Sequence, residues 1–496
     1  MNFEEIDWKS EAESIQFEGR AFINGGYVDP LNNEWFDCHS PVDGRLLSTV
    51  ASCDSADVDL AVANAKQTFE SGVWSKMAPA ERKNVLIKFS GLIEEHAIEL
   101  SLTDTLDMGK PVVETYCGDI VYSADAIRWC AEAVDKIYDQ IAPTASDEIG
   151  LITREPVGVV GVIVPWNYPL LMACWKLGPA LAAGNSVVLK PSEKSPLSAI
   201  RVASLALQAG IPPGVLNVVP GFGNTVGQAL GRHLDVDAIA FTGSTKVAKQ
   251  LLVYAGESNM KRVWMEAGGK SPNIVFSDAP DLRVAAETAA AAIAQNQGEV
   301  CSAGSRLLVQ RSISDKFIPM VVEAMAEWRP GNPLDPKVNC GALVDKVQMD
   351  RVLEYIELGQ REGAKLLSGG SQLFKESGGT YVEPAIFVNV KNSMRIAQEE
   401  IFGPVLSIIE FDDVEDAIRI ANDTPYGLAA GVWTSDISKA HLVAKALRAG
   451  SVWVNQFEAG DMTAPFGGFK QSGNGRDKSL HAFDKYTELK ATWIKL

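Results

Sequence analysis

The chain has 496 residues, of which 46% are hydrophobic and 22% are charged, as is ordinary for a globular protein. This length is too great for one hydrophobic core and predicts about three domains. The net charge of -18 would repel nucleic acid and anionic membrane surfaces, so we expect neither as a partner. The acidic N-terminus lacks the apolar segment of a signal peptide and no later run reaches membrane-spanning length, so we expect a cytoplasmic protein.

We expect residues up to 135 to be mostly helical after Ala56, and TASDEIGLITREPVG (144–158) to form an exposed hairpin. From residue 156 onward, short β-branched runs alternate with longer helical runs, which predicts parallel sheets covered on both faces. The first series has strands at 157–164, 186–192, 214–221, 237–244 and 263–269, and helices at 168–184, 196–210 and 245–256. The second series has strands at 271–278, 306–310, 405–411, 427–435 and 451–455, and helices at 281–297, 314–328, 413–423 and 438–450.

The turns that follow the strands of such a sheet are where ligands bind. In VPWNYP (164–169), two prolines fix the backbone around Asn167. Asn167 is either a turn-forming residue or a rigid amide that donates to a developing oxyanion, and the sequence leaves both interpretations open.

Two further turns suit a dinucleotide. In LKPSEKSP (189–196), Glu193 on the adenosine ribose would favour NAD over NADP, although a solvated pair with Lys190 is the competing interpretation. GFGNTVG (221–227) and FTGSTKVA (241–248) place glycines and hydroxyls at helix starts, which suits a pyrophosphate. Neither is a complete GxGxxG motif, and simple glycine turns explain them equally well.

Two reactive side chains follow. Glu266 in VWMEAGGKSPN has apolar neighbours that would raise its pKa toward that of a general base, unless it pairs with Lys270 or Arg262. Cys301 in GEVCSAGS has few aliphatic neighbours, which disfavours a small buried hydrophobe. A nucleophilic role needs local activation, because a free thiol is only a few per cent thiolate at neutral pH. The seven cysteines are scattered without CxxC or Cys/His clusters, so we expect neither disulfides nor a metal site.

The motifs VPWNYP, KPSE, FTGST, MEAGGKSPN, GEVCSAGSR, EEIFGPV and PFGGFKQSG occur in this order. In this order and spacing the chain resembles the aldehyde dehydrogenase superfamily over nearly its whole length. The resemblance implies an α/β fold with two doubly wound Rossmann-like domains and a small β oligomerisation element. It implies an NAD-binding domain (1–138 and 156–266), a catalytic domain (267–468), and an oligomerisation element (139–155 and 469–496) of a homodimer or homotetramer.

The same resemblance implies the NAD(P)-dependent oxidation of an aldehyde to a carboxylic acid. Cys301 would form a thiohemiacetal whose oxyanion is held by Asn167, and Glu266 would activate the water that hydrolyses the thioester. Two alternatives remain. In a CoA-acylating enzyme, CoA rather than water would release the acyl group from the thioester, and the presence of Glu266 favours water. The other alternative is a non-catalytic NAD-binding protein. The implied cofactor positions are Ile163, Trp166, Lys190, Glu193, Gly223, Gly227, Ser244, Glu400 and Phe402. The chain departs from the family pattern at Ala248, in place of glycine, and at Asp477, in place of glutamate, which leaves a proton-relay role there open.

The stretch NQFEAGDMTAPFGGFKQSGNGRDKSLHAF is similar to bacterial enzymes acting on γ-glutamyl-γ-aminobutyraldehyde and 4-guanidinobutyraldehyde. The implied substrate positions are Tyr168, Trp175, Phe457, Glu458 and Asp461. Aromatic faces attract cations by about 0.5–2 kcal/mol each, and the two carboxylates would add to this. We therefore expect an ω-amino or guanidino aldehyde, with a broad aliphatic aldehyde dehydrogenase and a betaine aldehyde dehydrogenase as alternatives.

Overall fold

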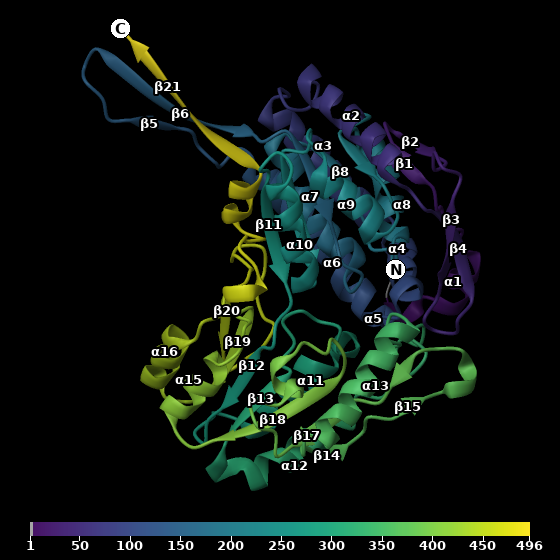
Figure 1. The fold of residues 1–496 in the computed structure, drawn as a ribbon, viewed down its shortest axis with the longest axis vertical. Helices are drawn as coiled ribbons and strands as arrows, with labels where there is room; N and C mark the ends of the chain where they lie inside the picture. Colours follow the sequence, from purple (N-terminus) through teal and green to yellow (C-terminus); the bar gives the residue numbers. More distant parts are fainter. Residues whose placement is uncertain (1–2) are drawn as a thin grey trace.

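The computed structural model describes residues 3–496 and contains two seven-stranded sheets with a smaller sheet projecting from the body (Figure 1). The first large sheet has the order β11-β10-β7-β8-β9-β1-β2, and β7 to β11 run parallel. Its strands are β1 (Ala21–Ile23), β2 (Gly26–Val28), β7 (Val159–Ile163), β8 (Ser186–Lys190), β9 (Leu216–Val218), β10 (Ala238–Gly243) and β11 (Arg262–Ala267).

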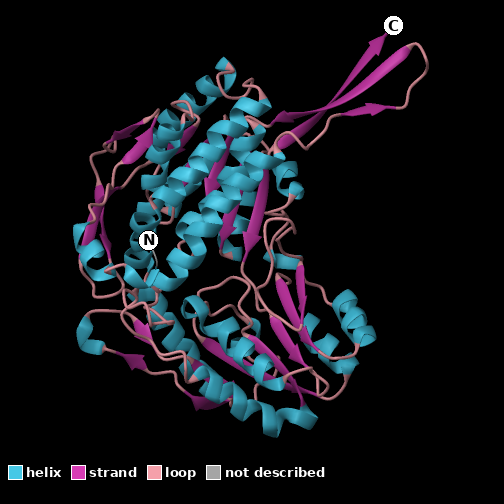
Figure 2. Ribbon diagram, turned by 180° about the vertical axis from the view of Figure 1, so that it is seen from behind, coloured by secondary structure: helices cyan, strands magenta, loops and turns pink. Residues whose placement is uncertain are grey.

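Helices cover both faces of this sheet, as the view from behind shows (Figure 2). Alternate residues of β7 explain this, since Val160 and Val162 enter one apolar cluster whereas Val159 and Ile163 enter another. The surrounding helices are α2 (Ser55–Ser71), α3 (Pro79–Glu95), α4 (Ala97–Met108), α6 (Ile120–Ala133), α7 (Pro169–Ala183), α8 (Leu197–Ala209), α9 (Gln228–Arg232) and α10 (Thr245–Gly256), with the shorter α1 (Trp8–Ser14) and α5 (Val112–Glu114). The predicted glycine ends of two helices are confirmed, because Gly184 and Gly210 close α7 and α8 with φ values of 97° and 107°.

The second large sheet has the order β14-β17-β18-β13-β12-β19-β20, with only β14 antiparallel among its pairings within residues 3–496. Its strands are β12 (Pro272–Val275), β13 (Arg306–Gln310), β14 (Lys365–Ser368), β17 (Ala385–Val388), β18 (Val405–Phe411), β19 (Ala429–Trp433) and β20 (Ser451–Val454). Its helices are α11 (Leu282–Ala294), α12 (Ser314–Met325), α13 (Lys346–Arg361), α14 (Arg395–Gln398), α15 (Val414–Asn422) and α16 (Ile437–Ala446). Ile274 and Val275 of β12 enter different apolar clusters, so this sheet is also covered on both faces.

Three predicted helices end before the expected residue: the helices expected at 281–297 and 314–328, and the helix expected at 438–450, which ends at Ala446. The helix expected at 281–297 ends at Ala294, because Asn296 and Gln297 adopt left-handed φ values of 46° and 54°. The helix expected at 314–328 ends at Met325. The left-handed turn at Asn296 and Gln297 leads the chain into the loop that holds Cys301.

The projecting sheet joins both parts of the segment expected to mediate oligomerisation. β21 (Thr487–Lys495) pairs along its length with β6 (Glu148–Pro156), which also pairs with β5 (Gln140–Ala142). The C-terminus lies at the tip of this sheet (Figure 1). Two two-stranded sheets complete the fold: β3 (Trp35–His39) with β4 (Leu46–Ala51), and β15 (Gln372–Leu373) with β16 (Tyr381–Val382). None of the helices within residues 3–496 combines the length and apolar character needed to cross a membrane.

Candidate active site

The carboxyl ends of three neighbouring strands bring the predicted cofactor positions to one edge. Ile163 at the end of β7 pairs in register with Lys190 of β8 and Phe241 of β10. The chain leaves these strands into the turns that hold Trp166, Glu193 and Ser244. The parallel register therefore gathers turns that lie up to 80 residues apart in the chain.

Lys190 occupies the centre of this edge. It is buried, and its Nζ donates to the Pro191 carbonyl at 2.6 Å and lies 3.4 Å from the Glu193 carboxylate. Burial lowers the pKa of Lys190, and Glu193 opposes this shift. The pair proposed as a competing interpretation is thus present, but its lysine is buried rather than solvated.

Glycines and a capping hydroxyl complete the edge. Gly223 begins a π-helical turn (η3, Gly223–Gly227), and a Cβ built at Gly223 would meet no atom within 4 Å. A Cβ at Gly227 would lie 3.8 Å from Lys190 Cδ, which places η3 directly beside the lysine. Ser244 caps the N-terminus of α10 by accepting from the Val247 N–H at 3.4 Å.

The second half of the molecule contributes Glu400 and Phe402 to the same region. The Phe402 ring packs edge-on against the Trp166 ring, with centroids 5.2 Å apart. Glu400 accepts from the Gly269 N–H at 3.3 Å, and burial raises its pKa to about 7. Both residues line a small hollow, whose wall also includes Val300, the neighbour of Cys301.

The loop of Cys301 is tied to the loop of Asn167 by two amides. Asn296 Nδ2 donates to the Asn167 carbonyl at 2.9 Å, and Asn167 Nδ2 donates to the Glu299 carbonyl at 2.7 Å. Asn167, Asn296 and Glu299 are all buried, whereas Cys301 is partly exposed. The Asn167 amide is therefore held beside the cysteine loop by the second half of the chain, which a residue that only forms a turn would not require.

Burial raises the pKa of the Cys301 thiol, and the neighbouring carboxylates of Glu458, Glu266 and Glu400 raise it further. The thiol is therefore protonated at rest, and its activation requires a base. The sequence alone did not show which group activates the Cys301 thiol. The structure brings a carboxylate, Glu266, close enough to influence the thiol.

Glu266 is buried near the end of β11, and its Oε1 has no hydrogen-bond partner within residues 3–496. Burial and the nearby Asp477 raise its pKa well above the usual range, while Lys176 and Lys485 act in the opposite direction. A buried carboxylate with a free oxygen and a raised pKa suits a general base.

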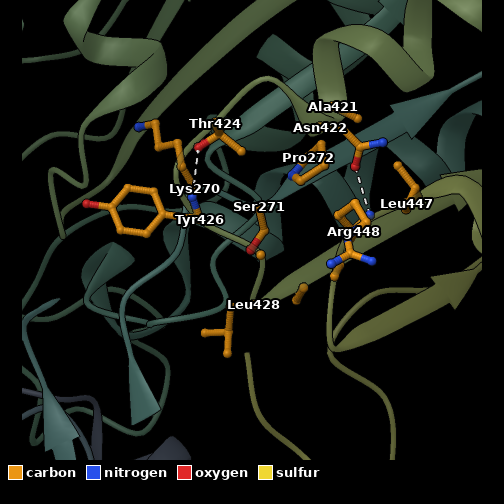
Figure 3. Close-up of a pocket in the computed structure, with 14 residues that line it drawn as sticks. Lys270, Ser271, Pro272, Ala421, Asn422, Thr424, Tyr426, Leu428, Leu447 and Arg448 are labelled. Carbon is orange, nitrogen blue, oxygen red and sulfur yellow. Dashed lines mark hydrogen bonds between the residues drawn. The ribbon is translucent and has the colours of Figure 1, made fainter. Parts of the chain in front are cut away.

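Neither alternative partner, Arg262 or Lys270, pairs with Glu266 within residues 3–496. Arg262 forms an ion pair with Glu488 at 2.8 Å. Lys270 lines both the hollow beside Glu400 and a second hollow with Thr424 and Tyr426 (Figure 3). Its Nζ has no hydrogen-bond partner in the described chain, and burial lowers its pKa to about 7. The structure therefore gives no ion pair between Glu266 and either residue.

Asp477 stands behind Glu266 between two buried lysines. Lys176 of α7 donates to its Oδ2, and Lys485, in a 3-10 helix over Leu480–Lys485, donates to its Oδ1. Burial alone would raise the pKa of Asp477, but the two lysines hold it below the usual value. Sequence reasoning identified Asp477 and missed both lysines, although a single lysine in the apolar run ACWKLGPALAAG was a signal.

The predicted substrate residues occupy different environments. The Trp175 ring packs edge-on against the Phe466 ring, with centroids 5.5 Å apart, and the Phe457 ring is tilted against the Trp453 ring, with centroids 4.9 Å apart. Tyr168 is already covered by the Lys110 ammonium, 3.3 Å from its ring centroid.

Of the two predicted acidic positions, Glu458 has a pKa that is raised by desolvation, and Ser302, next to Cys301, and Lys478 oppose this shift. Asp461 is exposed, and it accepts from Thr463 N–H and Oγ1 at 2.8 and 2.6 Å. A lysine that sequence reasoning missed, Lys478, lies over Trp175 with its Nζ 5.2 Å from the ring centroid.

This α/β fold, with a thiol, a buried amide and a carboxylate with an oxygen free within residues 3–496 on segments beside its two large sheets, is that of an α/β enzyme. The chain belongs to the aldehyde dehydrogenase family, whose model matches residues 27–492. The predictions of this family, of its fold and of an aldehyde dehydrogenase activity are thereby confirmed.

Relatives of known name resemble the chain over almost its entire length. It is 54% identical over 497 aligned positions to the NADP/NAD-dependent aldehyde dehydrogenase PuuC of Escherichia coli (strain K12), covering 100% of both chains. A solved indole-3-acetaldehyde dehydrogenase in complex with NAD+ is 68% identical, with a TM-score of 0.98 and 99% coverage of both chains. A solved γ-glutamyl-γ-aminobutyraldehyde dehydrogenase from Burkholderia cenocepacia J2315 is 59% identical, with a TM-score of 0.97 and 99% coverage of both chains.

Proposed function

We propose that this protein oxidises an aldehyde bearing an amino group to the carboxylic acid, through a covalent intermediate on Cys301 and with NAD as the hydride acceptor. The observation that supports the proposal is that Asn167 is hydrogen bonded into the loop that precedes Cys301, while Glu266, with a carboxylate oxygen free within residues 3–496, acts on the Cys301 thiol.

Each of the three side chains suits a particular step of the oxidation. Cys301 Sγ attacks the aldehyde carbon, and its proton leaves to Glu266, the carboxylate with an unoccupied oxygen. Asn167 Nδ2 carries two hydrogens, of which one is bonded to Glu299; the second, with the Cys301 N–H, stabilises the oxyanion. Once Glu266 has passed the thiol proton to solvent, it takes a proton from the attacking water and returns it to the Cys301 sulfur as the acid leaves. We therefore propose water rather than CoA as the acceptor of the acyl group.

The edge of the first sheet fits NAD. The open space at Gly223 admits a pyrophosphate, and the N-terminus of α10 at Ser244 favours its charge. Glu193 would bind the adenosine ribose and repel a 2′-phosphate, which favours NAD over NADP. When bound, NAD accepts a hydride from the substrate on Cys301. The residues proposed to hold it are Ile163, Trp166, Lys190, Glu193, Gly223, Gly227, Ser244, Glu400 and Phe402.

One substitution tests the cofactor edge. A Cβ at Gly268 would lie 2.0 Å from both carboxylate oxygens of Glu400, so Gly268→Ala must displace this side chain. We expect the KM for NAD to rise about tenfold, equivalent to about 1.4 kcal/mol. Gly256→Ala is the matched control, because a Cβ there meets no atom within 4 Å. Equal KM values for NAD in both variants, measured by steady-state kinetics, would remove Glu400 from the cofactor site.

The preference for an amino group rests on the surroundings of Cys301. The rings of Tyr168 and Trp175 already contact the ammonium groups of Lys110 and Lys478, so the attraction for a cationic group rests on Phe457, Glu458 and Asp461. The substrate named for the Burkholderia relative is itself an amino-bearing aldehyde. A second candidate, an aldehyde with an indole ring, is favoured by the identity of 68% to the indole-3-acetaldehyde enzyme.

Substrate profiling distinguishes these candidates. NADH formation is measured with butanal, 4-aminobutanal, 4-guanidinobutanal, betaine aldehyde and indole-3-acetaldehyde. We expect kcat/KM for the best amino or guanidino aldehyde to exceed that for butanal by about tenfold or more, equivalent to about 1.4 kcal/mol. A kcat/KM for butanal equal to that for the amino and guanidino aldehydes would indicate a broad-specificity aliphatic aldehyde dehydrogenase. The highest kcat/KM for indole-3-acetaldehyde would support the second candidate.

We further propose a cytoplasmic homo-oligomer, a dimer or tetramer. All seven cysteines are free, which suits a reducing compartment. The projecting sheet exposes Ile141, Leu489 and Trp493, apolar side chains that a second subunit would cover. The division into an NAD-binding domain (1–138 and 156–266), a catalytic domain (267–468) and an oligomerisation element (139–155 and 469–496) is part of this proposal.

A further inference from the structure

Three buried charged side chains lie near the end of α4 and just after it: Asp104, Asp107 and Lys110. None of them takes part in the proposed steps of the reaction. The two aspartates lie three residues apart in the helix, so both project from one face of α4. A buried carboxylate needs hydrogen-bond donors, and the donors here come from the first residues of two other helices.

Asp104 caps helix α7, which begins two residues after Asn167. The first turn of a helix has backbone N–H groups without an intrahelical acceptor, and Tyr168 at the N-cap position of α7 offers no side-chain acceptor. Asp104 Oδ2 accepts from the Leu170 N–H at 3.4 Å, and the carboxylate also suits the positive end of the helix dipole. The start of α7 is therefore held by α4.

Lys110 contacts the same turn. Its ammonium lies 3.3 Å from the centroid of the Tyr168 ring and forms an ion pair with Asp119 at 2.5 Å. Tyr168 joins Asn167 to the start of α7. Asn167 is thus held by two parts of the chain: its amide and carbonyl bond to the loop before Cys301, and the residues after it contact α4 and Lys110.

The second aspartate of α4 caps the next helix of the first sheet, α8. This helix begins at Leu197, and Pro196 at its N-cap position offers no side-chain acceptor. Asp107 Oδ2 accepts from the Leu197 N–H at 3.0 Å. The turn between β8 and α8, which contains Glu193, therefore ends at a residue that Asp107 anchors.

We propose that Asp104 and Asp107 are positioning residues with separate roles. Asp104 holds the Asn167 amide where it stabilises the oxyanion, and Asp107 holds the turn in which Glu193 meets the adenosine ribose. This inference rests on the proposed function, because each aspartate acts through a residue of the proposed site. Loss of Asp104 should lower the rate of the chemical step at unchanged NAD affinity, whereas loss of Asp107 should weaken NAD binding.

The first test is a double-mutant cycle of Asp104→Ala and Asn167→Ala, with kcat/KM measured for the best aldehyde of the substrate profile at saturating NAD. We expect Asp104→Ala to lower kcat/KM about tenfold, because a displaced amide binds the oxyanion poorly. In the Asn167→Ala background the same change should lower kcat/KM by less than about twofold, since the amide is already absent. Asp104→Asn keeps an acceptor oxygen and should retain kcat/KM within about threefold of wild type. If Asp104→Ala does not fold, Asp104→Ser takes its place in the cycle.

Calorimetry with NAD separates the two aspartates. Asp104→Ala should leave the Kd for NAD within about twofold of wild type, whereas Asp107→Ala should raise it about fivefold or more. Asp436→Ala is the matched control, because Asp436 caps α16 by accepting from the Ser438 and Lys439 N–H groups at 2.8 and 3.1 Å. Since α16 packs on the second sheet, this variant should change neither kcat/KM nor the Kd for NAD.

Four results would overturn the inference. They are an unchanged kcat/KM in Asp104→Ala, an equal loss from Asp104→Ala with and without Asn167, an equal loss in Asp104→Asn and Asp104→Ala, and an equal Kd for NAD in Asp104→Ala and Asp107→Ala. Each leaves the proposed function intact if Asn167→Ala alone lowers kcat/KM. A wild-type kcat/KM in Asn167→Ala would instead remove the oxyanion step from the proposed function.

Discussion

Cys301→Ala is expected to reduce NADH formation by about 10⁴-fold or more, because the proposed pathway begins with a bond between Cys301 Sγ and the aldehyde carbon. The side chain is small and partly exposed, so its removal should cost little stability. NAD binding, measured by calorimetry, should be unchanged, because the proposed cofactor edge belongs mainly to the first sheet.

Cys117→Ala is the matched control, since Cys117 is an exposed thiol in η2 (Thr115–Asp119), outside the proposed site. It should retain full activity. Substantial activity in Cys301→Ala on every aldehyde of the substrate profile would contradict the assignment of the nucleophile.

Asp477→Asn is expected to destabilise the protein by about 3–5 kcal/mol, because it leaves the ammonium groups of Lys176 and Lys485 buried without a compensating charge. The substitution conserves shape and removes the carboxylate alone. The free energy of unfolding from denaturant titration measures the effect, and the dehydrogenase activity should fall with it, because Glu266 shares this cluster.

Asp484→Asn provides the control, since Asp484 is exposed and pairs with the half-exposed Arg154 at 2.9 Å. Neutralising such a surface pair should cost less than about 1 kcal/mol. The variant Lys176→Met, Asp477→Leu, Lys485→Met should be more stable than Asp477→Asn, because it removes all three buried charges together. Equal stability losses in Asp477→Asn and Asp484→Asn would show that the buried cluster is not a major contribution.

Most strands and helices of the two large sheets could be predicted, because each is bounded by a change from β-branched to helical periodicity and often by glycine. Strands β1 and β2 could not, since three-residue strands carry too little pattern, and their place beside β9 depends on distant contacts. The helix predicted at 281–297 was too long because left-handed Asn296 and Gln297 have no signature in the local sequence.

In the candidate site, too, some features could be predicted from the sequence and others could not. Cys301, Glu266 and Asn167 could be singled out, because each departs from the composition expected of its local structure. The contacts that explain their behaviour could not, since Lys176, Lys485 and Lys478 come from segments remote in sequence. A buried ion cluster is a property of the packed chain, and only the structure shows which carboxylate each lysine meets.

The most direct measurement is the mass of the intact Glu266→Gln protein after it is mixed with NAD and 4-aminobutanal and quenched in acid. The glutamine cannot take a proton from the thiol or from the attacking water. Acylation should therefore be slower, with solvent accepting the thiol proton, whereas hydrolysis should stop, so the acyl group should accumulate. The account predicts one added acyl mass on Cys301, located by peptide analysis and absent in the Cys301→Ala, Glu266→Gln double variant. Formation of NADH without any adduct, or with the adduct on another residue, would contradict it.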